Sequence, residues 1–203
     1  MDEREKRLIG EQIEPADRPK APGSLELVQR FVNTWNHDFP SEWDRLGTAE
    51  KARSWLVAKG LVSSGARISG QDAARLRELR EAVRELAAAN QGRAPDPGAV
   101  RIVHDVSRQA MLLVDFDASG RTALKPARGG VTGAAAAVLG VLHEAHLTGA
   151  WSRLKGCREC GYAFYDRSKN RSAAWCAMSI CGNRMKNRAY RQRTSRARRV
   201  RAD

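Results

Sequence analysis

A chain of 203 residues with 42% hydrophobic and 29% charged residues has enough apolar material for one or two globular domains. No run of about 18 apolar residues occurs and no apolar stretch follows the charged N-terminus, so we expect neither a membrane span nor a secretory signal, and a cytoplasmic location. The net charge of +13 is concentrated at one end, because residues 151–203 hold 15 Lys/Arg against three acids. This concentration of positive charge indicates a polyanionic partner for the C-terminal part.

The first predicted elements are an arm and two helices. Residues 1–23 combine charges with prolines and lack periodic apolar positions, which predicts a flexible arm. Residues 25–36 carry apolar side chains at helical spacing, with Ser24 as a candidate cap. A second, short helix is expected from the N-cap residue Thr48 to Gly60.

Two longer helices are expected next. Ser69 and Asp72 form a capping-box pattern at the start of a run of leucines and valine at intervals of three and four, which continues to Gly92. Asp96 and Pro97 supply another N-cap with proline at the first helical position. The valines and isoleucine that follow would also suit a strand, but we assign a helix.

A hairpin and a small-residue helix complete the N-terminal part. The segments 111–116 and 121–124 carry β-type residues on either side of a glycine-containing turn. Thr132 then opens an alanine-rich helix over residues 133–147. Residues 24–149 are therefore predicted to form a helical domain with one β-hairpin, and the whole chain to be mainly α in an α+β arrangement.

All four cysteines lie in one short segment, as Cys157-x2-Cys160 and Cys176-x4-Cys181 separated by fifteen residues. Two short-range pairs of thiolates are typical of tetrahedral zinc sites, and a four-sulfur shell leaves no position for water or substrate. We predict one structural Zn²⁺ in a small zinc-ribbon or treble-clef-like finger. The alternative is four ordinary buried or free cysteines.

Aromatic residues between the cysteine pairs have two interpretations. Phe164 and Trp175 are expected to form the minimal core of a module too small to fold without metal. Tyr162 or Tyr165 could instead stack on a base, which would favour single-stranded RNA over duplex DNA.

A basic helix is predicted after the last cysteine. Arg184, Arg188 and Arg191 recur at helical spacing on one face, with Lys186 and Arg193 beside it, and we expect these five residues to contact nucleic acid. The alternative is a solvated helix whose arginines pair with acids, but residues 182–202 contain no Asp or Glu.

Some positively charged side chains should balance the charge of the metal site rather than contact nucleic acid. Lys155, Arg158 or Arg184 are candidates to offset the negative charge of a zinc–thiolate centre, which leaves the module at roughly +10. We place the finger and its helix at residues 150–194 and a flexible basic tail at 195–203.

The same segment resembles the CGNR zinc-finger family. The resemblance rests on the residues from Trp151 to Cys157, on Cys160-Gly-Tyr-Ala-Phe-Tyr-Asp-Arg-Ser-Lys-Asn, and on Trp175-Cys-Ala-Met and Cys181-Gly-Asn-Arg. It covers about a quarter of the chain and implies that the four cysteines bind zinc. Proteins of this family commonly carry an N-terminal ABATE domain, described for stress-induced transcription regulators, and Phe31-Val-Asn-Thr resembles its opening motif.

Three further patterns are weaker candidates for sites. His143 and His146 are three residues apart, one short of the zinc-protease spacing, so packed or exposed histidines are the expected reading. The segment 129–133 could cradle an anion but lacks the phosphate-loop lysine, which favours a loop and N-cap. Asn33 is polar inside an apolar stripe, and local bonding and a small-molecule pocket both stay open.

We therefore expect a DNA-binding transcription regulator whose N-terminal domain senses an effector or forms a homodimer. An RNA-binding protein that uses the same basic module is the alternative. An enzyme with a site in residues 24–149 is disfavoured, because no nucleophile–base set is recognisable.

Overall fold

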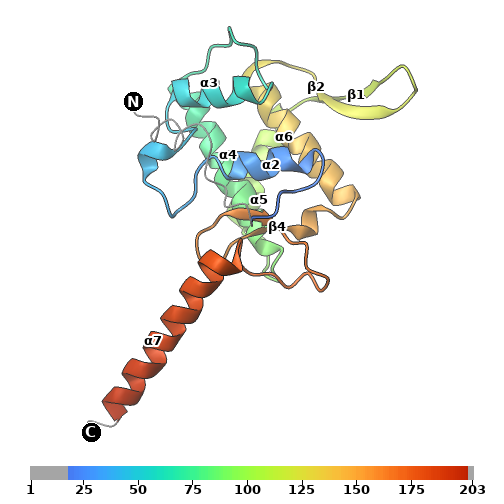
Figure 1. The fold of residues 1–203 in the computed structure, drawn as a ribbon. Helices are drawn as coiled ribbons and strands as arrows, with labels where there is room; N and C mark the ends of the chain where they lie inside the picture. Colours follow the sequence, from blue (N-terminus) through green and yellow to red (C-terminus); the bar gives the residue numbers. More distant parts are fainter. Residues whose placement is uncertain (1–17, 201–203) are drawn as a thin grey trace.

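The computed structural model describes residues 18–200, with side chains up to residue 195, and most of the expected arm (1–17) and the end of the expected tail (201–203) lie outside the described residues. The mainly helical α+β fold is confirmed (Figure 1). No helix in the described range is long and apolar enough to cross a membrane. The helices are α2 (Leu25–Val32), α3 (Ala49–Ala58), α4 (Gly70–Ala89), α5 (Pro97–Gln109), α6 (Gly130–Leu147) and α7 (Asn183–Val200). The strands are β1 (Leu112–Phe116), β2 (Thr122–Pro126), β3 (Leu154–Gly156) and β4 (Ala163–Tyr165), each pair antiparallel.

The longest helix, α4, lies at the centre of the core and packs against α2, α3, α5, α6 and β3. It starts with the predicted capping box, in which Ser69 and Asp72 each bond the other's backbone N–H. Its apolar stripe, Leu76, Leu79 and Val83, is buried. Each such side chain stabilises the fold by roughly 1.5–3 kcal/mol, so α4 organises the N-terminal core.

Two predicted helix boundaries differ from the structure. Helix α2 ends at Val32 rather than at residue 36, because Asn33 is its C-cap and the chain turns there, and Ser24 donates to Glu144 instead of capping. Helix α6 begins at Gly130, three residues before the predicted start. Gly129 is its extended N-cap and Gly130 takes a left-handed φ of +67°, so this pair of glycines turns the chain into the helix.

The other predicted elements of the N-terminal part are confirmed. Thr48 accepts from Lys51 N at the start of α3, and Asp96 accepts from Ala99 N at the start of α5, whose proline lies in the first turn. Strands β1 and β2 form the predicted hairpin, which projects beyond α6 in Figure 1.

The second strand pair, β3–β4, is packed onto the N-terminal core. Strand β3 contacts α4, and β4 contacts α2. At Gly156 an added Cβ would lie only 3.1 Å from the Cβ of Ala88, so β3 approaches the helix as closely as glycine permits. The strands that flank the first cysteine pair are thus held against the helical core.

Candidate metal centre and basic helix

The four cysteines converge on one point. The Sγ atoms of Cys157, Cys160, Cys176 and Cys181 all lie within 4.8 Å of one another, and all four residues are buried. Cys160 Sγ lies 3.8 Å from Cys176 Sγ, and Cys181 Sγ lies 3.6 Å from each of these two atoms. Tetrahedral Zn²⁺ with bonds of about 2.3 Å requires sulfur separations of about 3.8 Å. The residues therefore fit a zinc ion, and all four ligand positions are filled by sulfur.

Local backbone geometry brings the first pair together. The N–H of Cys157 donates to Tyr162 O at 2.8 Å, and the N–H of Gly161 donates back to Cys157 O at 2.9 Å. Gly161 has a φ of +71°, a left-handed conformation that favours glycine. This tight turn between β3 and β4, residues 157–162, is called the knuckle below.

The second pair closes the site from the other end of the module. Cys176 follows Trp175 in a loop, and Cys181 lies in a short π-helical turn, Met178–Gly182, that leads directly into α7. Phe164 is buried beside the sulfurs with Trp175 partly buried, as predicted for a minimal core. The metal ligands therefore connect β3, β4 and the start of α7.

Without a cation, ionisation of one thiol is favoured and ionisation of the other three is opposed. The hydrogen bond shared with Cys157 raises the pKa of Cys160 and raises that of Cys176 to about 12, while burial raises the pKa of Cys181. Cys157 accepts these bonds, which lowers its pKa. A bound Zn²⁺ supplies the positive charge that lets all four act as thiolates and cross-links the segments that carry them.

Arginines from the N-terminal part surround this negative charge. The guanidinium of Arg18 lies 4.2 Å over the ring of Tyr162; burial lowers its pKa, but the thiolates, with Cys176 foremost, outweigh burial and raise it. Arg84 of α4 donates to Gly161 O in the knuckle at 2.7 Å, and to Val32 O and Trp35 O at 2.7 and 2.6 Å. Arg84 thus joins the C-terminal end of α2 to the metal site.

All three cations expected to serve the metal have other partners, and Arg184 bonds Asp38 at 2.9 Å. Lys155 is buried and pairs with Asp166 at 2.7 Å; burial acts to raise the pKa of Asp166, but the bond from Lys155 outweighs it and lowers the pKa to about 2. Arg158 donates to Gln91 at 2.8 Å. The sequence did not point to Arg18 or Arg84 as neighbours of the metal site. Of these two residues, Arg84 alone could have been found from the sequence, because it lies on the buried face of α4.

Asn33 connects α2 to β4. Its Nδ2 donates to Ala163 O at 2.8 Å, and its Oδ1 accepts from Ala163 N at 2.8 Å, so both backbone groups are bonded as a neighbouring strand would bond them. Gln29, one turn earlier, donates to the same carbonyl at 3.1 Å. Through these two bonds Asn33 positions the strand that follows the knuckle.

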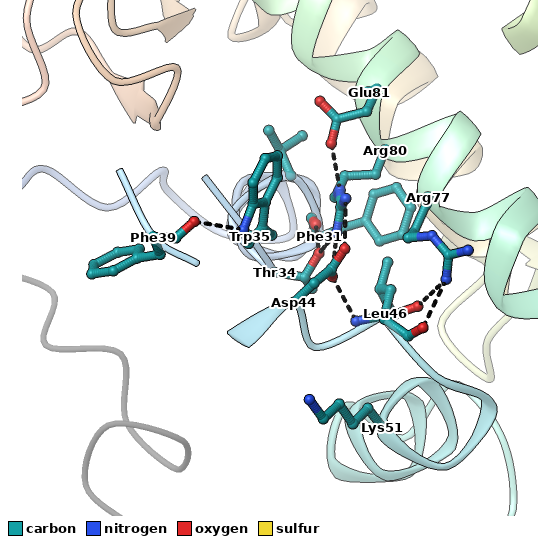
Figure 2. Close-up of polar contacts among 12 residues, drawn as sticks. Phe31, Thr34, Trp35, Phe39, Asp44, Leu46, Lys51, Arg77, Arg80 and Glu81 are labelled. Carbon is teal, nitrogen blue, oxygen red and sulfur yellow. Dashed lines mark hydrogen bonds and ion pairs between the residues drawn. The ribbon is translucent and has the colours of Figure 1, made fainter. Parts of the chain in front are cut away.

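A second polar network fixes the loop between α2 and α3, residues 33–48 (Figure 2). Arg80 is buried on α4 and donates to both carboxylate oxygens of Asp44, at 2.6 and 2.9 Å, and to Thr34 at 3.2 Å. Trp35 Nε1 donates to Phe39 O at 3.2 Å. Because several of these groups are buried and mutually bonded, the loop is held in one conformation beside the metal site.

The predicted basic helix forms and leaves the body of the protein. Helix α7 starts at Asn183 and continues to Val200, past the expected boundary at residue 195, because the sequence offers good helix formers and no breaker. Lys186, Arg191 and Arg193 are exposed. Arg184 bonds Asp38 at 2.9 Å and Arg188 bonds Glu159 at 2.8 Å, so acids from outside residues 182–202 supply the partners that the helix itself lacks.

The remaining candidate residues take structural positions. Tyr162 is 2% exposed and Tyr165 packs partly against the core. His143 is exposed, and His146 stacks on Trp151 with ring centroids 5.2 Å apart. Across the described residues, the cysteine cluster is the one group of three or more candidate ligands found close enough to share a metal.

Two family models match the chain. The ABATE model, described as "Putative stress-induced transcription regulator", matches residues 25–153, and the CGNR zinc-finger model matches residues 153–194. A comparison with curated proteins found no match. The first match covers more than half of the sequence, and the second covers all four cysteines. The chain therefore belongs to the ABATE family and ends in a CGNR zinc finger whose four cysteines hold one structural zinc ion.

Proposed function

We propose that the protein is a DNA-binding transcription regulator in which the zinc finger presents α7 to duplex DNA. The observation that carries this proposal is the exposure of α7, which projects from the body in Figure 1 and has nearly all its side chains up to residue 195 exposed. It has neither an acid nor an apolar stripe to pack on another helix. A helix that is polar on all sides is not held by apolar packing, so its cationic side chains stay available to a charged partner.

The dimensions of α7 suit the major groove. Eighteen helical residues span about 27 Å, and the major groove of B-DNA, about 12 Å wide, admits a helix. The metal site lies at the N-terminal end of α7, with Cys181 two residues before Asn183. Zinc therefore anchors the N-terminal end of this positively charged helix. An anchored helix loses less conformational freedom on binding than a free basic segment.

Duplex DNA is favoured over single-stranded RNA because Tyr162 and Tyr165, the two aromatic residues between the cysteine pairs that were candidates for base stacking, are poorly placed for it. Tyr162 is buried beneath Arg18, and Tyr165 packs partly against the core. Recognition of single strands commonly uses exposed aromatic platforms. We likewise propose a binding role rather than a catalytic one, since the metal shell of four sulfurs has no open position for a substrate.

The test is duplex binding measured by fluorescence anisotropy as a function of salt. If about six phosphates are neutralised, log K should fall against log salt with a slope near −5. Single-stranded RNA should compete less well than duplex DNA at matched salt. A Cys176→Ser variant, which lacks one zinc ligand, should lose most of this binding. Equal duplex binding by the variant and the wild type would show that the finger is irrelevant to binding.

A further inference from the structure

We propose that α7 has two functionally different faces: Arg184 and Arg188 dock the helix on the body of the protein, and Lys186, Tyr190 and Arg193 form the surface that contacts DNA. This inference rests on the proposed function and specifies which residues perform it. It departs from the simpler expectation that the arginine stripe at helical spacing is the contact surface.

The docking face is defined by two ion pairs one helical turn apart. Arg184 Nη1 bonds Asp38 at 2.9 and 3.1 Å, and Arg188 uses both terminal nitrogens on the two oxygens of Glu159, at 2.8 and 3.2 Å. The side chain of Glu159 is only 8% exposed, so Arg188 covers it. Paired contacts of this kind fix the rotation of a helix about its axis.

Both acids belong to parts of the molecule that are held in place. Glu159 lies in the knuckle between two zinc ligands. Asp38 lies in the loop that Arg80 and Asp44 fix, and its N–H donates to the side chain of buried Asn36 at 3.0 Å. The ion pairs therefore tie α7 to two rigid points rather than to mobile side chains.

The opposite face then points away from the body. With about 100° of rotation per residue, Lys186, Tyr190 and Arg193 lie about 180–240° around the axis from Arg184. All three are exposed, and Tyr190 has 64% of its surface exposed. Within the described residues, neither Lys186 nor Arg193 makes an ion pair. Two unpaired cations that flank an exposed phenol suit phosphates on either side of a groove and a contact within it.

Electrostatics favours this outer face over the docking face. A phosphate that approaches Arg184 or Arg188 meets Asp38 or Glu159 as well, so the local charge is nearly cancelled. Lys186 and Arg193 release condensed counterions without first breaking an ion pair. Arg191 follows the line of Arg184 about 10 Å further along the axis, and it is left unchanged in the variants below.

Two double variants that remove equal charge test the assignment. K186Q/R193Q should lower the steepness of the salt dependence by about 1.8 and weaken duplex binding on the order of 50-fold at 0.1 M salt. R184Q/R188Q should change the steepness by less than half as much. Tyr190→Ala should weaken binding while the salt slope stays unchanged, because it removes contact area and no charge.

Three outcomes separate the two levels of the proposal. Failure of the zinc-loaded wild-type protein to bind duplex DNA would refute the proposed function itself. Wild-type binding with an equal or larger slope loss in R184Q/R188Q than in K186Q/R193Q would refute the two-face assignment alone, provided that zinc content and helical circular dichroism match the wild type. If R184Q/R188Q misfolds, the single variants R184Q and R188Q replace it, compared with K186Q: a slope loss in each that is less than half of the roughly 0.9 expected for K186Q supports the assignment, and an equal loss in either overturns it.

Discussion

Replacing Asn33 with alanine tests whether the N-terminal helices and the zinc finger are stabilised together. Asn33 is 2% exposed and bonds both backbone groups of Ala163. In the variant, the N–H of Ala163 loses its acceptor in a buried place, which costs about 1–3 kcal/mol. The carbonyl keeps its bond from Gln29, so losing the second bond costs about 0.5–1.5 kcal/mol. We expect a decrease of about 2–4 kcal/mol in the free energy of unfolding.

Thermal unfolding of the zinc-loaded protein measures this decrease. For a chain of this size the melting temperature should fall by roughly 4–15 °C. Zinc transfer to a chromogenic chelator should also become faster, because Asn33 holds the strand that follows the knuckle. The matched control is Asn187→Ala on the exposed part of α7, which should stay within about 0.5 kcal/mol of the wild type. Equal melting temperatures and zinc-transfer rates for the two variants would refute the reasoning.

Three further perturbations follow from other contacts. Gly133→Ala would place a Cβ 2.0 Å from the backbone oxygen of Arg128 and should destabilise the protein by about 1–3 kcal/mol in thermal unfolding. Gly140→Ala is the control, because the nearest atom there is 3.6 Å away and alanine should be neutral or stabilising by up to about 1 kcal/mol. A more stable Gly133→Ala variant than Gly140→Ala variant would contradict this reasoning. Lys155→Met removes the ion-pair partner of the buried carboxylate of Asp166 and should lower the free energy of unfolding by about 3–5 kcal/mol. Urea titration measures this decrease, and an unaltered unfolding midpoint would contradict it. Removal of zinc by a chelator should abolish hydrogen-exchange protection in β3 and β4 and restore it on zinc addition, and protection that persists without zinc would show that the finger folds without metal.

Local signals determined most of the helices in advance. Ser69 with Asp72, Thr48, and Asp96 before Pro97 each marked a helix start that the structure contains, because a capping side chain bonds backbone groups only two or three residues away. The start of α6 was missed, since the two glycines turn the chain by backbone conformation without a capping side chain. The β-hairpin was predicted for the same local reason, from the glycine-containing turn between its strands.

The sequence by itself determined the zinc ligands, the α+β class and the charge of the last helix, because ligand spacing, periodicity and composition are properties of short segments. Only the tertiary structure decided how these parts are joined and oriented. Asn33 reaches β4 across 130 residues of chain, Arg84 reaches the knuckle across 77, and Asp38 reaches Arg184 across 146. No local pattern encodes such partners, since each bond depends on where packing of the core places two distant backbone segments. The orientation of α7, and with it the face available to DNA, is likewise decided by the tertiary structure.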